Sequence, residues 1–145
     1  MSNNDTFTQA FTLLTISISS QIELLGRVEG DKSKDVADLH ALAEMILDLV
    51  NSSEELVIAS IEACFESELA KMVDVTRGVM NADFDSKIKF ANRGVFISPE
   101  EYQVECAKSL SRLEKNAVDK QIARFAAMRQ EVNELLNKIE TIAIS

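Results

Sequence analysis

The chain has 145 residues, of which 46% are hydrophobic and 27% are charged, and its formal net charge is -9. This length allows one ordinary domain whose core needs no disulfide and no metal. The excess negative charge repels nucleic acid and anionic lipid, so we expect no nucleic-acid partner and no membrane partner.

The N-terminal residues lack the features of a targeting segment. The stretch "MSNNDTFTQAF" has no basic region, and Thr, Ser and Gln interrupt the apolar run that follows it, so neither a signal peptide nor a membrane span is expected. Cys64 and Cys106 stand among apolar neighbours at helical spacing, which predicts two reduced core cysteines. We therefore expect a cytoplasmic protein.

The first predicted element is a helix over residues 6–29. Apolar residues recur in steps of three and four at Phe7, Phe11, Leu14, Ile18, Ile22 and Leu25, which is the period of a helix. Asp5 is the expected N-cap, and Gly26 with Gly30 supplies the stop. A competing signal is the β-branched alternation of residues 15–19, "TISIS", which suits a strand.

The second apolar stripe continues over residues 34–77 and has two interpretations. Ser52 and Glu55 fit a capping box, which would divide the segment into helices over 34–50 and 53–77. However, no Gly or Pro lies between Asp31 and Arg77, and the stripe resumes in phase after Ser52. One continuous helix is equally consistent with the sequence.

Residues 78–98 form the irregular part of the chain. We expect a short helix over 84–92, with Gly94 in the left-handed position after its end and Phe90 touching Val95 in a Schellman cap. The alternative is a hairpin in which "KIKF" and "VFI" are the strands and "ANRG" is the turn.

The stretch "SPEE" predicts the start of the last helix, over residues 99–142. Ser98 is an N-cap, Pro99 suits the first helical position, and Glu101 completes a capping box. Ile97 and Tyr102 are spaced for a hydrophobic staple.

The neighbouring Phe96 is expected to close one end of the helical bundle, with an exposed docking side chain as the alternative.

The last helix carries a long apolar stripe. Its members are Cys106, Leu110, Leu113, Val118, Ile122, Phe125, Met128, Val132, Leu135, Ile139 and Ile142. With no internal repeat and no low-complexity segment, we predict one all-α domain over residues 1–145. Its fold is an elongated bundle of three to four helices, with long antiparallel helices in coiled-coil-like packing.

The sequence carries no recognisable catalytic, cofactor-binding or metal-binding pattern. His40 is the only histidine, and although it shares a helix face with Glu44, two ligands do not make a metal site. We expect His40 to be half-exposed and paired with Glu44. Glu62, Glu66 and Asp74 follow the outer face of their helix. We therefore expect no enzyme activity, no cofactor and no metal.

Helix lengths suggest the function. A first helix of about 36 Å cannot cover two helices of about 65 Å each, so part of each apolar stripe would face water. We expect a second copy of the chain to cover it, as a homodimer. The predicted function is a non-enzymatic protein–protein interaction module, as an adaptor, regulator, inhibitor or small acidic chaperone, with an unidentified protein as a further partner. The candidate contact residues are Phe96, Ile122, Phe125, Met128 and Val132.

The alternative function is a ligand-sensing bundle. Polar residues interrupt the apolar stripes at 51–53 and at 114–121, and such interruptions can mark a cavity that holds a small molecule between helices.

Overall fold

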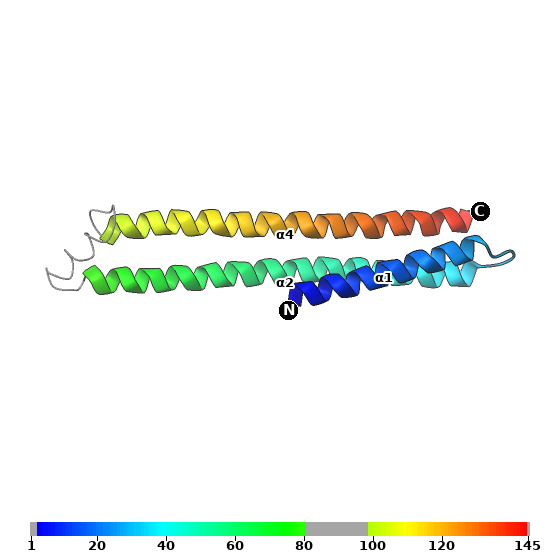
Figure 1. Cartoon of the computed structure of the whole chain (residues 1–145), viewed down its shortest axis with the longest axis horizontal. Coiled ribbons are helices and arrows are strands. Elements are labelled where there is room, and N and C mark those ends of the chain that lie inside the picture. Colours follow the sequence, from blue (N-terminus) through cyan, green and yellow to red (C-terminus); the bar gives the residue numbers. More distant parts are fainter. Residues whose placement is uncertain (1–2, 81–98, 145) are drawn as a thin grey trace. The chain divides into compact units, whose positions relative to one another are not determined.

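The computed structural model describes residues 3–80 and 99–144 and contains three helices in that part of the chain (Figure 1). They are α1 (Asn3–Gly26), α2 (Ser33–Met80) and α4 (Pro99–Ile144). Helix is the only regular secondary structure of these residues, so the expected all-α bundle is confirmed. The predicted helix over 84–92, its Schellman cap and the alternative hairpin all fall outside the described residues.

The chain divides into two compact units. One consists of residues 1–54 and 123–145, and we call it the three-helix unit because α1 belongs to it. The other consists of residues 55–122, and we call it the two-helix unit because α2 and α4 are the helices described in it. Each unit contains part of α2 and part of α4. The expectation of a single domain over 1–145 stays a prediction.

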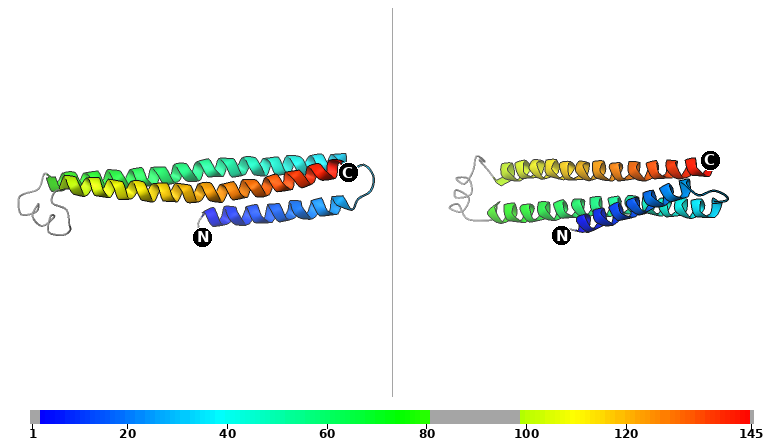
Figure 2. Two further views of the ribbon diagram at one scale, coloured as in Figure 1. Left: turned by 90° about the horizontal axis from the view of Figure 1, so that it is seen from above. Right: turned by 45° about the vertical axis from the view of Figure 1, so that its right-hand side comes forward.

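Within the three-helix unit, α1, the first part of α2 and the last part of α4 lie side by side, and α2 runs antiparallel to the other two (Figure 2). Their apolar stripes meet in a core. It consists of Phe11, Ile18, Ile22, Leu39, Ala43, Ile46, Val50, Phe125, Met128, Val132, Leu135 and Ile139. Burying these side chains is the main term that stabilises the unit.

Of the two ends of α1, only the C-terminal end lies where the sequence predicts it. The helix begins at Asn3, so the predicted N-cap at Asp5 is wrong, and Asp5 lies inside the helix. Asn, Ser and Asp are all favoured N-cap types, and the four residues 2–5 are all of these types, so residue type alone does not choose between them. The stop is confirmed, because α1 ends at Gly26 and Gly30 adopts a φ of 96°, a conformation that glycine reaches without strain.

The strand alternative for residues 15–19 is wrong, because these residues belong to α1. Thr15 is the buried polar residue of the core. Its Oγ1 donates a hydrogen bond to the carbonyl of Thr12 at 2.9 Å. This bond satisfies the hydroxyl inside the helix, which removes the cost of burying a polar group.

Helix α2 is continuous from Ser33 to Met80. The interpretation as one helix is therefore confirmed, and the alternative of a break near Ser52 is wrong. Its start is fixed by Asp31, whose Oδ1 accepts hydrogen bonds from the Ser33 hydroxyl at 2.6 Å and the Ser33 N–H at 3.0 Å. Both bonds favour the charged form of the Asp31 carboxyl and therefore lower its pKa. The bond from the Ser33 hydroxyl has the larger effect.

Helix α4 begins at Pro99, as predicted, and ends at Ile144. The proposed cap residue Ser98 and the staple residue Ile97 lie outside the described residues. The predicted apolar stripe is confirmed as core only in its second half, at Phe125, Met128, Val132, Leu135 and Ile139. Its first half lies in the two-helix unit.

Candidate functional site

The two units differ in how far they bury their apolar side chains. Every described side chain classed as buried belongs to the three-helix unit. In the two-helix unit Ile61 and Phe65 are only half-buried, while Leu69 and Leu113 remain 39% and 57% exposed. A pair of helices can cover only one side of each apolar stripe. The two-helix unit therefore presents apolar surface on its outside.

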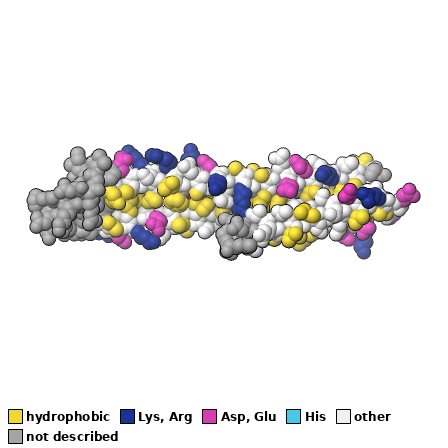
Figure 3. Space-filling view, in the orientation of Figure 1, with side chains coloured by type: hydrophobic (Ala, Val, Ile, Leu, Met, Phe, Trp, Pro, Cys, Tyr) yellow, Lys and Arg dark blue, Asp and Glu magenta, His cyan; other side chains and the backbone are white. Residues whose placement is uncertain are grey.

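This surface is visible as a stripe. In Figure 3, hydrophobic side chains follow the two-helix unit lengthwise between rows of charged side chains. Contiguous apolar surface with a polar border is characteristic of sites where proteins bind one another.

A groove with a volume of about 270 Å³ lies between the helices of the two-helix unit. From α2 it is lined by Glu62, Phe65, Glu66 and Leu69, and from α4 by Ala107, Leu110, Ser111 and Glu114. We call it the acidic groove, because its charged lining residues are glutamates. Its apolar lining residues are Phe65, Leu69, Ala107 and Leu110, and the carboxylates of its polar lining accept hydrogen bonds.

A second groove of the same unit has a volume of about 360 Å³. Its lining includes Met72, Val75, Tyr102 and Cys106. A hydrogen bond to the Cys106 side chain is the largest cause that raises the pKa of the Tyr102 hydroxyl, followed by electrostatic repulsion from Cys106 and by burial.

The charged residues of the second groove are already paired, because Lys71 Nζ lies 3.1 Å from Glu68 Oε1.

Four of the predicted contact residues lie in the described chain, and Phe96 lies outside it. Ile122, in the two-helix unit, is 43% exposed. The other three, Phe125, Met128 and Val132, are buried in the core of the three-helix unit. Contacts within the chain account for their burial. No measurement tests these residues as partner contacts, and in that role they stay predictions.

Polar contacts join α2 and α4 inside the three-helix unit. Arg129 holds Glu54 in a bidentate arrangement, with Nη1 3.1 Å from Oε1 and Nη2 donating to Oε2 at 3.2 Å. Arg129 Nη1 also donates to Asn51 Oδ1 at 3.4 Å. The polar interruption at 51–53 thus contributes a side chain to a contact between helices. The small-molecule cavity inferred from the sequence stays untested.

Helix α1 is attached near its start to the same part of α4. The rings of Phe7 and Phe125 have centroids 6.0 Å apart. Arg124 donates a hydrogen bond to the Thr8 hydroxyl, and its guanidinium lies 4.9 Å from the Phe125 ring centroid. Stacking and cation–π contacts of this kind favour one defined position of α1.

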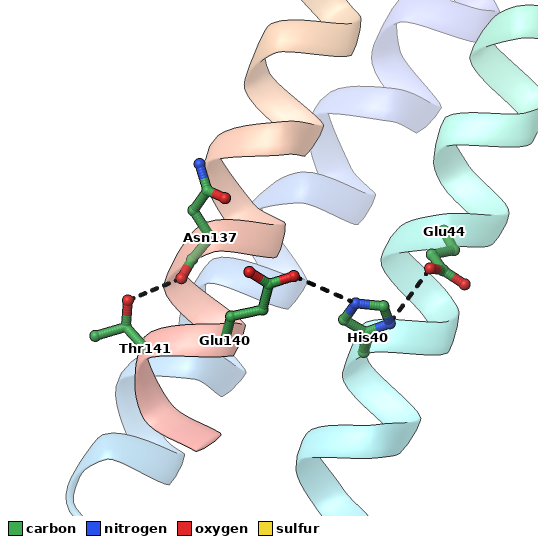
Figure 4. A network of polar contacts seen from close by, with 5 residues as sticks. All are labelled: His40, Glu44, Asn137, Glu140 and Thr141. Carbon is green, nitrogen blue, oxygen red and sulfur yellow. Dashed lines mark hydrogen bonds and ion pairs between the residues drawn. The ribbon is translucent and has the colours of Figure 1, made fainter. Parts of the chain in front are cut away.

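His40 pairs as expected. Its Nδ1 lies 3.5 Å from Glu44 Oε1 on the same helix, and its Nε2 lies 3.8 Å from Glu140 Oε1 on α4 (Figure 4). Next to Glu140, Thr141 donates a hydrogen bond to the Asn137 carbonyl. Within the described residues, no group of three or more His, Cys, Asp or Glu side chains is arranged to hold a metal ion.

A cavity of about 610 Å³ adjoins this pair, lined by residues that include Lys32, Val36, His40, Glu44 and Glu140. Its charged residues are of both signs. The Lys32 ammonium donates to the carbonyl of Leu25 at 3.4 Å. The sequence did not indicate this cavity, because its walls come from residues about 100 positions apart.

The two cysteines are free thiols, but they are not core residues. Cys64 is exposed and Cys106 is half-exposed, so the expectation of two core cysteines is wrong. Both lie in the two-helix unit, where α2 and α4 are the helices that the described residues form.

No helix in the described part of the chain has the length and apolar character that a membrane crossing demands.

Comparison with protein-family models, with curated proteins and with solved structures finds no match for this chain. Its function is therefore inferred from its own residues.

Proposed function

We propose that this protein is a non-enzymatic helical protein–protein interaction module, with the role of an adaptor, regulator, inhibitor or small acidic chaperone. Another protein binds to its two-helix unit. The observation that supports this proposal is the contrast in burial along α2 and α4. Where α1 provides a third helix, their apolar stripes are buried, and in the two-helix unit Leu69 and Leu113 stay exposed. A bound partner would remove this surface from water, which is favourable.

A cytoplasmic location is part of the proposal. Cys64 and Cys106 are free, and Cys64 is exposed. Exposed thiols persist where the compartment is reducing. The expected homodimer remains a prediction.

Photo-crosslinking tests the proposal with a matched pair of positions. A photoreactive phenylalanine derivative replaces either Leu69, 39% exposed in the two-helix unit, or Leu14, 38% exposed on α1. Because the two sites are equally accessible, random collisions should label them equally. We expect a protein adduct at position 69 in cells that produce the chain, and much less at position 14.

The adduct at position 69 should also weaken when Phe65, in the same groove, is changed to Ala. Equal yields at both positions, or no adduct at position 69, would refute an interaction site on the two-helix unit.

A further inference from the structure

The acidic groove has a charge character of its own. Its charged lining residues are Glu62, Glu66 and Glu114, and none of its lining residues is a Lys, Arg or His. Within the described residues, these three carboxylates make no ion pair. The nearby Lys108 is paired with Glu105 on its own helix, at 3.4 Å. The groove therefore offers three carboxylates that no described residue pairs, beside the apolar side chains of its lining.

This charge favours one kind of occupant. A second copy of the chain that docked through the same groove would place its own three glutamates against these three, and each copy carries a net charge of -9. Like charges brought together across an interface oppose association. A cationic partner would instead gain favourable pairing with Glu62, Glu66 and Glu114.

The shape of the groove favours a helix. Phe65 and Leu69 on α2 and Leu110 on α4 contribute apolar side chains to a lining that comes from both helices. A third helix packs into such a groove with apolar residues spaced three and four apart. The three-helix unit shows this packing within the chain, since Phe11, Ile18 and Ile22 of α1 are buried there.

We infer that the acidic groove binds a basic amphipathic helix of another protein. Its apolar stripe contacts Phe65, Leu69 and Leu110, and Lys or Arg residues beside that stripe pair with Glu62, Glu66 and Glu114. This inference rests on the proposed interaction function and names the partner's chemistry.

Fluorescence anisotropy with designed peptides tests it. The probe is a labelled peptide of about 18 residues, long enough for about 27 Å of helix, with Leu in steps of three and four and Lys beside them. Its counterpart has Glu in place of each Lys. We expect the full-length protein to bind the Lys peptide at least about tenfold more tightly, and to lose affinity as salt is added.

Matched triple variants separate the groove from the net charge. Glu62→Gln, Glu66→Gln and Glu114→Gln together should weaken binding about 30-fold, taking about threefold for each exposed pair. The control combines Asp119→Asn, Glu131→Gln and Glu134→Gln, three exposed carboxylates outside the groove. It removes the same charge and should change the affinity less than about threefold. Circular dichroism verifies that both variants remain helical.

Three outcomes overturn the inference. Equal losses in the two triple variants would mean that net charge alone attracts the peptide. Equal affinity for the Lys and Glu peptides would mean that the glutamates do not select the partner. Absence of binding, with a mass by sedimentation of twice 16.1 kDa, would mean that a second copy covers the groove. An adduct at position 69 with a protein other than a second copy would still support the interaction function in each case, whereas the absence of any such adduct would refute that function.

Discussion

The burial contrast predicts that the same substitution has very different costs in the two units. Phe125 is fully buried in the three-helix unit, with an exposed fraction of 0%, and Phe65 is half-buried in the two-helix unit. Truncating a fully buried Phe to Ala removes its transfer free energy and leaves a cavity, a loss of about 3–5 kcal/mol. We expect Phe125→Ala to lower the free energy of unfolding by that amount.

Phe65→Ala should cost about 1 kcal/mol in the isolated chain. Full burial of a Phe side chain contributes about 1.5–3 kcal/mol, and half of this is available at Phe65. No closed cavity remains there, because the acidic groove is open to water and its volume would only increase. The losses in the free energy of unfolding of the two variants should therefore differ by at least about 2 kcal/mol.

Urea denaturation followed by circular dichroism at 222 nm measures both changes, at a protein concentration low enough to keep the chain monomeric. A loss of 3 kcal/mol or more for Phe65→Ala in the monomer would refute the reasoning, since it would mean that Phe65 is as enclosed as Phe125. A loss of 3 kcal/mol or more that appears only when the Lys peptide is bound would agree with the reasoning.

Three further predictions follow from the contacts of the three-helix unit. Arg129→Met should cost about 1–2 kcal/mol because it leaves the mostly buried Glu54 carboxylate unpaired, and a double-mutant cycle with Glu54→Gln should give a coupling of about 1 kcal/mol, with zero coupling as the contrary result. The lowered pKa of Asp31 means that its charge stabilises the start of α2 above the ordinary value of 3.8 and ceases to do so as the pH falls through the lower folded value. Asp31→Asn should thus melt at a lower temperature than the native chain at pH 7, and the two melting temperatures should converge as the pH falls through the lowered pKa of Asp31. A constant gap at all pH values would contradict this. Hydrogen exchange along α2 should be slower in the three-helix unit than in the two-helix unit, and uniform protection would speak against an open pair of helices.

The sequence by itself indicated helix over the residues of α1, α2 and α4, the end of α1 and the start of α4. The step of three and four residues is a local property of the chain, as are the effects of Gly26 and Pro99 on backbone geometry. The continuity of α2 was undecided because Ser52 and Glu55 also fit a cap. The structure gives one helix, in which Glu54 pairs with Arg129, 75 positions later in the sequence.

The tertiary structure decided which parts of the apolar stripes became core. Leu113 and Val132 belong to the same stripe of α4, yet Leu113 is 57% exposed and Val132 is fully buried. Their local sequences do not distinguish them, because burial depends on whether a third helix lies alongside. The position of the third helix depends on where α1 packs. Contacts of Phe7 with Phe125 and of Thr8 with Arg124 define that position. The acidic groove was hidden in the sequence for the same reason: Glu62, Glu66 and Glu114 gather around one site only when α2 and α4 are paired.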